Sequence, residues 1–66
     1  MRTNLKLLRI KNHLTQFQMA DELGVGRQTY AAVEVGRLRG SEELWKSVQT
    51  RFGVEDAEMW TLMQNE

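Results

Sequence analysis

Cysteine and proline are absent from this 66-residue chain, and histidine occurs once, as His13. Without thiols there is no disulfide and no thiolate metal site, and one imidazole cannot build a zinc site. The chain also lacks an uncharged apolar run of membrane-span length and a signal-peptide core at its start. We therefore expect no cofactor, no metal, no membrane partner and a cytoplasmic location.

The short length predicts a single domain over residues 1–66. The absence of proline, together with many strong helix formers, predicts an all-α fold. A domain this small leaves much of its surface in water, and neither disulfides nor a metal are available to stabilise it. Oligomerisation is the remaining source of stability, so we expect a homodimer.

The formal net charge is zero, which argues against a nucleic-acid partner, but the charges are unevenly distributed. Residues 1–39 carry seven Lys and Arg against three Asp and Glu, whereas residues 40–66 carry two against six. A basic first part and an acidic last part would orient the molecule on a polyanion, although chance segregation in a short chain gives the same pattern.

Hydrophobic spacing and capping residues predict five helices, over about residues 4–12, 16–23 and 27–35 and then beginning near residues 42 and 56. We expect caps at Thr3 or Asn4, at Thr15 and at Ser41. Residues 60–63 either continue the last helix or leave it as an extended tail. The predicted core comprises Leu5, Leu8, Leu14, Met19, Ala20, Leu23, Tyr30, Val33, Leu44 and Val48, with Trp45 or Phe52.

Residues 15–34 are the most informative part of the chain. They predict a short helix, a tight turn at Gly24 and a second helix that opens with Arg27-Gln28. This layout is typical of a helix-turn-helix, whose second helix enters the DNA major groove. Arginine can pair bidentately with guanine and glutamine with adenine, so these two are our candidate base readers, unless they are simply solvated surface residues.

Several motifs in order resemble the phage repressor and Cro type of regulator, the XRE family, over roughly residues 4–62. They are Leu5-Lys6-Leu7-Leu8-Arg9, Leu14-Thr15-Gln16, Met19-Ala20, Leu23-Gly24-Val25, Arg27-Gln28-Thr29, Val33-Glu34, Gly36-Arg37 and Phe52-Gly53-Val54. The resemblance implies a compact five-helix, lambda-repressor-like domain with its helix-turn-helix in the second and third helices. It is closest to small single-domain members, encoded by bacteria or phages.

The resemblance also implies roles for individual residues. Gln16 is expected to contact a DNA phosphate, the alternative being a capping partner for Thr15. Ala32 is small where a longer polar residue is frequent, and its methyl could touch a thymine methyl. Arg9 and Glu34 are expected to form an internal ion pair. The other candidate phosphate contacts are Thr29, Arg37, Arg39 and Lys11.

Some positions depart from the family pattern. Gly26 replaces the usual Ser or Thr cap of the third helix, and Glu55 occupies the cap site of the fifth. Tyr30 replaces a smaller aliphatic residue, which implies a reshaped core or a hydroxyl that reaches a phosphate. Apolar residues stand where polar ones are frequent, at Leu7, Ile10 and Phe17. The candidate dimer or partner surface comprises Phe17, Met59, Trp60, Leu62 and Met63.

Together these features predict a sequence-specific, double-stranded-DNA-binding transcriptional regulator, a repressor rather than an enzyme. It would act as a homodimer on a near-palindromic operator through the major groove. Two alternatives remain open at this point: an antitoxin that also binds a toxin, and a protein-interaction module of the same fold. The operator sequence, the regulated genes and the direction of regulation are not encoded in recognisable form.

Overall fold

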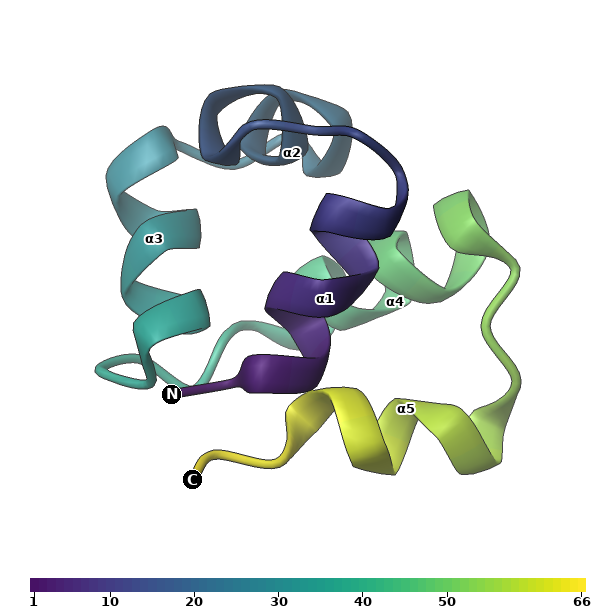
Figure 1. Cartoon of the computed structure of the whole chain (residues 1–66). Coiled ribbons are helices and arrows are strands. Elements are labelled where there is room, and N and C mark those ends of the chain that lie inside the picture. The colour runs from purple at the N-terminus through teal and green to yellow at the C-terminus, as the bar shows by residue number, and fades with distance from the viewer.

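The computed structural model describes all 66 residues and contains five helices and no strand (Figure 1). The helices are α1 (Thr3–Lys11), α2 (Gln16–Leu23), α3 (Arg27–Val35), α4 (Glu42–Phe52) and α5 (Asp56–Met63). The predicted all-α fold is confirmed, and α5 includes the residues whose conformation was left open. None of the five helices has the length and apolar character needed to cross a lipid bilayer.

Side-chain caps explain where two of the helices begin. Thr15 accepts a hydrogen bond from the Gln18 N–H, and the Gln18 side chain accepts one in return from the Thr15 N–H. This reciprocal pair is a capping box. Ser41 caps α4 by accepting from the Leu44 N–H at 3.0 Å. The predicted side-chain cap of α1 is wrong, because α1 begins after Arg2 and has no side-chain cap bond.

The first helix lies at the centre of the molecule (Figure 1). It contacts α3 on one side and α5 on the other, whereas α2 packs against α3 and α4. In the view of Figure 1, α2 crosses the top, α3 stands at the left and α5 lies at the bottom. α2 and the start of α3 therefore lie at the end of the molecule away from α5, whereas the end of α3 approaches the C-terminal end of α5.

One apolar cluster draws residues from all five helices. Leu5, Met19, Tyr30, Val33 and Val48 have no exposed surface. The predicted core is confirmed, with Leu8, Leu14 and Phe52 packed against it as partly buried side chains and Trp45 inside it. This cluster fixes the mutual orientation of α2 and α3, which the candidate interface requires.

Candidate nucleic-acid interface

The turn between α2 and α3 is closed by backbone geometry. Gly24 ends α2 in the left-handed region, at φ 69°, and the Val25 N–H donates to the Ala20 carbonyl at 3.0 Å. Gly26 precedes α3 in an extended conformation and offers no side-chain acceptor. The first-turn N–H groups of α3 therefore lack a side-chain cap, and such free donors favour anions.

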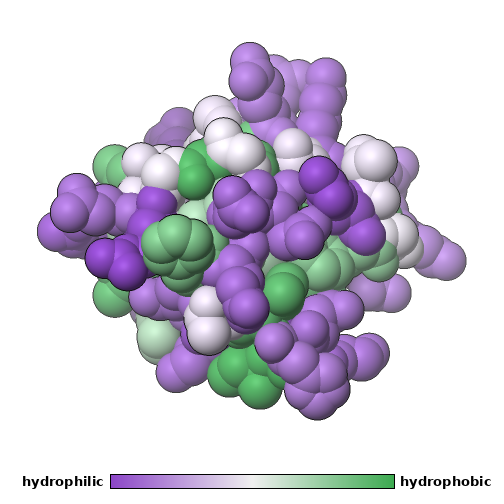
Figure 2. Space-filling model, turned by 90° about the horizontal axis from the view of Figure 1, so that it is seen from above, coloured by the Kyte–Doolittle hydropathy of each residue, from purple (hydrophilic) through white to green (hydrophobic).

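The head of α3 presents two long polar side chains to solvent. Arg27 and Gln28 are both exposed, and neither forms an ion pair or a side-chain hydrogen bond within the molecule. They border an open depression between the starts of α2 and α3. It is lined by Arg9, Thr15, Gln16, Phe17, Arg27, Gln28 and Ala31. From above, the α2 side of the molecule is covered largely by hydrophilic side chains, with separate apolar spots among them (Figure 2).

A buried carboxylate lies beneath this depression. Glu34 is 1% exposed and accepts two hydrogen bonds from Arg9, from Nε at 2.9 Å and from Nη2 at 3.1 Å. The Tyr30 hydroxyl donates to it at 2.5 Å and the Gln16 amide at 3.2 Å. We call these four residues the Glu34 cluster. It ties α1, α2 and α3 together through one bidentate ion pair and two neutral donors.

The pKa values in the cluster follow from burial and charge. Burial raises the pKa of the Glu34 carboxyl, but the bonds from Arg9, Tyr30 and Gln16 outweigh it and leave the pKa below its ordinary value. The hydrogen bond to Glu34 raises the pKa of Arg9. Burial, and then the bond to Glu34, raises the pKa of Tyr30. The carboxylate is thus held ionised and the phenol neutral.

The Helix-turn-helix family model matches residues 5–58 of the chain. The chain belongs to this family. An uncharacterized HTH-type transcriptional regulator of Methanocaldococcus jannaschii is 41% identical over 54 residues, which cover 82% of this chain and 82% of the relative. No solved structure matches the chain significantly. The resemblance to XRE-type helix-turn-helix proteins is thereby confirmed.

One candidate of the helix-turn-helix requires correction. Ala32 is 3% exposed, because it faces the interior side of α3, and so its methyl group cannot meet a base. Ala31 is the half-buried alanine that lines the depression beside Gln28. The small size of both alanines does not show which of them faces outward, because the rotation of α3 on the core decides that.

The Gln16 side chain bonds Glu34 and not Thr15. The capping box uses Gln18, so the alternative of Gln16 as the capping partner of Thr15 is wrong. The Gln16 amide nitrogen donates to Glu34 and carries a second hydrogen that can still donate. Gln16 is half-buried and lines the depression, and its phosphate contact stays a prediction. Tyr30, with no exposed surface, reshapes the core and cannot reach a phosphate.

The loop after α3 carries Arg37 and Arg39, both exposed, as is Lys11 at the end of α1. Arg2, which was not among the predicted site residues, holds this loop from beneath. The Arg2 guanidinium is buried and donates to the carbonyls of Leu38 at 2.7 Å and Arg39 at 3.4 Å. The loop that presents the two candidate phosphate contacts therefore has a defined backbone position.

Arg2 also joins the ends of two helices. Its guanidinium donates to the carbonyl of Val33 near the end of α3 and to that of Met63 at the end of α5, and it lies over the ring of Trp45. Burial lowers the pKa of this guanidinium. The C-terminal ends of helices carry partial negative charge, which favours a cation such as the Arg2 guanidinium. Backbone carbonyls therefore serve Arg2 in place of a carboxylate. No partner side chain signals this arrangement in the sequence.

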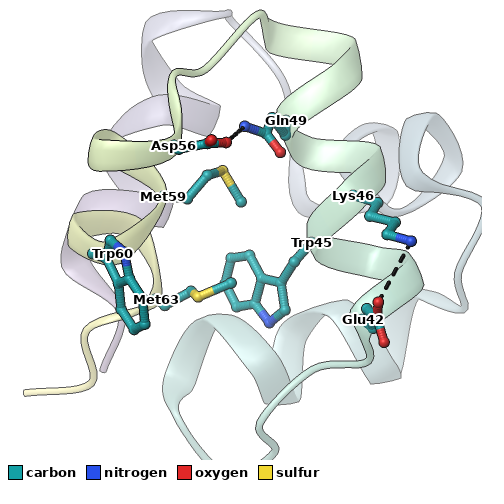
Figure 3. Close-up of a pocket in the computed structure, with 8 residues that line it drawn as sticks. All are labelled: Glu42, Trp45, Lys46, Gln49, Asp56, Met59, Trp60 and Met63. Carbon is teal, nitrogen blue, oxygen red and sulfur yellow. Dashed lines mark hydrogen bonds and ion pairs between the residues drawn. The ribbon is translucent and has the colours of Figure 1, made fainter.

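The candidate partner surface is smaller than predicted. Met59 and Leu62 are each 8% exposed and belong to the core, because α5 turns them toward α1 and α4. Trp60 is 74% exposed, and Met63 is half-buried. Figure 3 shows Met59 and Met63 of α5 and Trp45 of α4 pointing into the groove between these helices. Phe17 lies elsewhere, beside α3.

Proposed function

We propose that this chain is a transcriptional regulator, acting as a repressor, whose α3 reads base edges in the major groove. The observation that carries the proposal is the free exposure of Arg27 and Gln28 at the head of α3, above the Glu34 cluster. The Arg27 guanidinium can donate two hydrogen bonds to one guanine, and the Gln28 amide can donate to and accept from one adenine. A preformed support matters because a base-reading side chain must be held in register.

The cations that remain available to DNA support a phosphate-anchoring role. Arg2 and Arg9 are occupied inside the molecule, so the apparent excess of cations in residues 1–39 overstates the basic face. Lys11, Arg37 and Arg39 are exposed and border the helix-turn-helix in sequence. Each phosphate neutralised contributes about −0.9 to the slope of log affinity against log salt, so binding should weaken steeply as salt is added.

A homodimer on a near-palindromic operator completes the proposal. Two copies related by a twofold axis would place their α3 helices in successive major grooves, with half-site centres about 34 Å apart. The groove between α4 and α5, with the exposed Trp60 beside it, is our candidate dimer surface. It lies on other helices than α2 and α3, so a partner there leaves the base-reading residues free.

Selection of bound sequences from a random duplex pool tests the proposal. The wild-type chain should enrich a two-part motif, and Arg27→Ala and Gln28→Ala should each relax one position, by about 1–3 kcal/mol of discrimination. Arg51→Ala is the matched control, because it also removes one exposed cation, but from the end of α4 and outside the groove between α4 and α5. If the wild-type chain enriches no DNA motif, or if both α3 variants enrich the same motif as wild type, these residues do not read bases.

A further inference from the structure

Phe17 and Arg27 form a contact across the helix-turn-helix that the proposed function does not use. The guanidinium carbon of Arg27 lies 5.6 Å from the centre of the Phe17 ring, above its face. Both side chains line the depression described above and a smaller one next to it, where Ala20, Asp21 and Val25 are the other lining residues. Arg27 belongs to none of the ion pairs in the molecule.

Each residue of this pair breaks a local rule when taken alone. Arg27 is a cation in the first position of α3, where the helix dipole disfavours positive charge, and no acidic side chain follows in the first turn. Phe17 is 60% exposed in the first turn of α2, where a large aromatic ring gains little from burial. Such departures concentrate at functional positions.

The two departures compensate each other, because the negative face of an aromatic ring attracts a cation. A guanidinium that stacks on a ring uses its flat face, and its N–H edges stay free for hydrogen bonds in its own plane. The Phe17 contact and a bidentate contact with guanine therefore use different parts of Arg27. They can exist at the same time.

We propose that Phe17 is a positioning residue for Arg27, which it holds with its donor edge turned toward the DNA. This inference rests on the proposed function, in which Arg27 reads a base. It separates Phe17 from the other exposed apolar residues: Leu7, for example, lines a groove with Leu8 and Leu62 between α1 and α5. Phe17 thus belongs to the DNA-binding face rather than to a protein-partner surface.

The DNA test compares Phe17→Leu, which keeps an apolar side chain without a ring, with Phe17→Tyr, which keeps the ring. Phe17→Leu should reduce discrimination at the base pair read by Arg27 by about two- to fivefold, the usual size of an exposed cation–π contact. Phe17→Tyr should retain it. Arg27→Ala should lose about 5- to 150-fold at the same base pair, and adding Phe17→Leu to it should have no further effect there.

The outcomes separate this inference from the proposed function. If Arg27→Ala relaxes one base pair while Phe17→Leu selects like wild type, the positioning role is wrong and the base-reading role stands. An equal loss at every position, or a loss in the Arg27→Ala background, would make Phe17 a general DNA contact and overturn the inference. A wild-type chain without a motif overturns both.

A measurement without DNA tests the contact itself. In nuclear magnetic resonance spectra of the free protein, the Arg27 Hδ protons should show an upfield ring-current shift, lost in Phe17→Leu and kept in Phe17→Tyr. Leu7→Ala, which removes an equally exposed apolar side chain from α1, should leave these signals unchanged. If the chemical shifts of the Arg27 Hδ protons are the same in Phe17→Leu as in wild type, the inference is wrong.

Discussion

At the scale of single residues, the molecule contains two buried charges that are neutralised in different ways. Glu34 meets a guanidinium, a phenol and an amide, so each of its oxygens has a charged or strongly polar donor. Arg2 meets backbone carbonyls and an aromatic face. Both arrangements connect helices that are distant in sequence, and both lie under segments that we assign to DNA contacts.

Replacement of Glu34 by glutamine should destabilise the protein and flatten part of its pH dependence. The Arg9 side chain, which is 12% exposed, would lose its carboxylate partner, and removal of one partner of a buried ion pair typically costs about 3–5 kcal/mol. The folded-state pKa of Glu34 lies below its unfolded value of about 4.3, so its stabilisation is present above that pH and is lost as pH falls through the folded pKa.

Urea denaturation of wild type and Glu34→Gln between neutral and acidic pH measures this contribution. The difference between their free energies of unfolding should be full above about pH 5 and shrink as the solution becomes more acidic. Glu58→Gln removes an exposed carboxylate and should cost less than about 1 kcal/mol. A difference that stays constant down to the lowest pH would show that the charge of Glu34 does not matter.

The sequence predicted the Arg9–Glu34 pair but not the Arg2 contacts, for a physical reason. Both partners of an ion pair can be recognised in a sequence as residues of opposite charge, and the family resemblance indicates which two positions are paired. Backbone carbonyls occur at every position, so nothing distinguishes those that accept from Arg2. The predicted base contact of Ala32 was also wrong. Ala31 and Ala32 are neighbours on α3, and only the packing of the helix decides which of the two is buried.

At the scale of helices, the boundaries could be predicted because caps and glycines mark them locally. Thr15, Ser41, Gly24 and Gly53 stand where the structure uses them. The start of α1 could not be predicted in this way, because the residue before it, Arg2, forms no side-chain cap. The start of α3 is also bare, so this short helix depends on packing for its stability.

A cap introduced at Gly26 should stabilise α3. Gly26 has φ −67°, which any residue can adopt, and an added Cβ would lie 3.8 Å from the Thr29 hydroxyl, in ordinary contact. Gly26→Ser should raise the free energy of unfolding by about 0.5–1 kcal/mol, because the hydroxyl accepts from the Thr29 N–H and the unfolded chain loses freedom. Thermal unfolding measures the change.

Gly26→Ala provides the control, since it restricts the unfolded chain equally but offers no acceptor. Serine should therefore exceed alanine in melting temperature. If the two variants unfold at the same temperature, the bare N-terminus of α3 gains nothing from a side-chain cap.

At the scale of the whole molecule, the candidate DNA-binding and partner surfaces lie on different helices. The first is built from the starts of α2 and α3, and the second from α4 and α5. From the sequence, all the apolar residues between Met59 and Met63 were assigned to one partner surface. It could not tell Trp60 from Met59 and Leu62, because the faces of α5 are set by its packing on α1 and α4.

Trp60 should contribute most of the dimer contact. Large aromatic residues at interface centres cost at least about 2 kcal/mol when truncated, which corresponds to about a 30-fold weaker association. Trp60→Ser should weaken dimerisation by this amount in sedimentation equilibrium, while Leu7→Ser, also an exposed apolar residue, should not. A wild-type chain that sediments as a monomer at high concentration would exclude the proposed homodimer.

The groove between α4 and α5 has a spectroscopic consequence. It holds both tryptophans of the chain, one on each wall, and they differ in contact with water: Trp45 is 7% exposed and its indole N–H donates to the Arg39 carbonyl, whereas Trp60 is 74% exposed. Indole emission shifts to shorter wavelength when water is removed. The unlabelled protein therefore carries its own optical probe, and a blue shift on concentration would report that the outer wall has been covered.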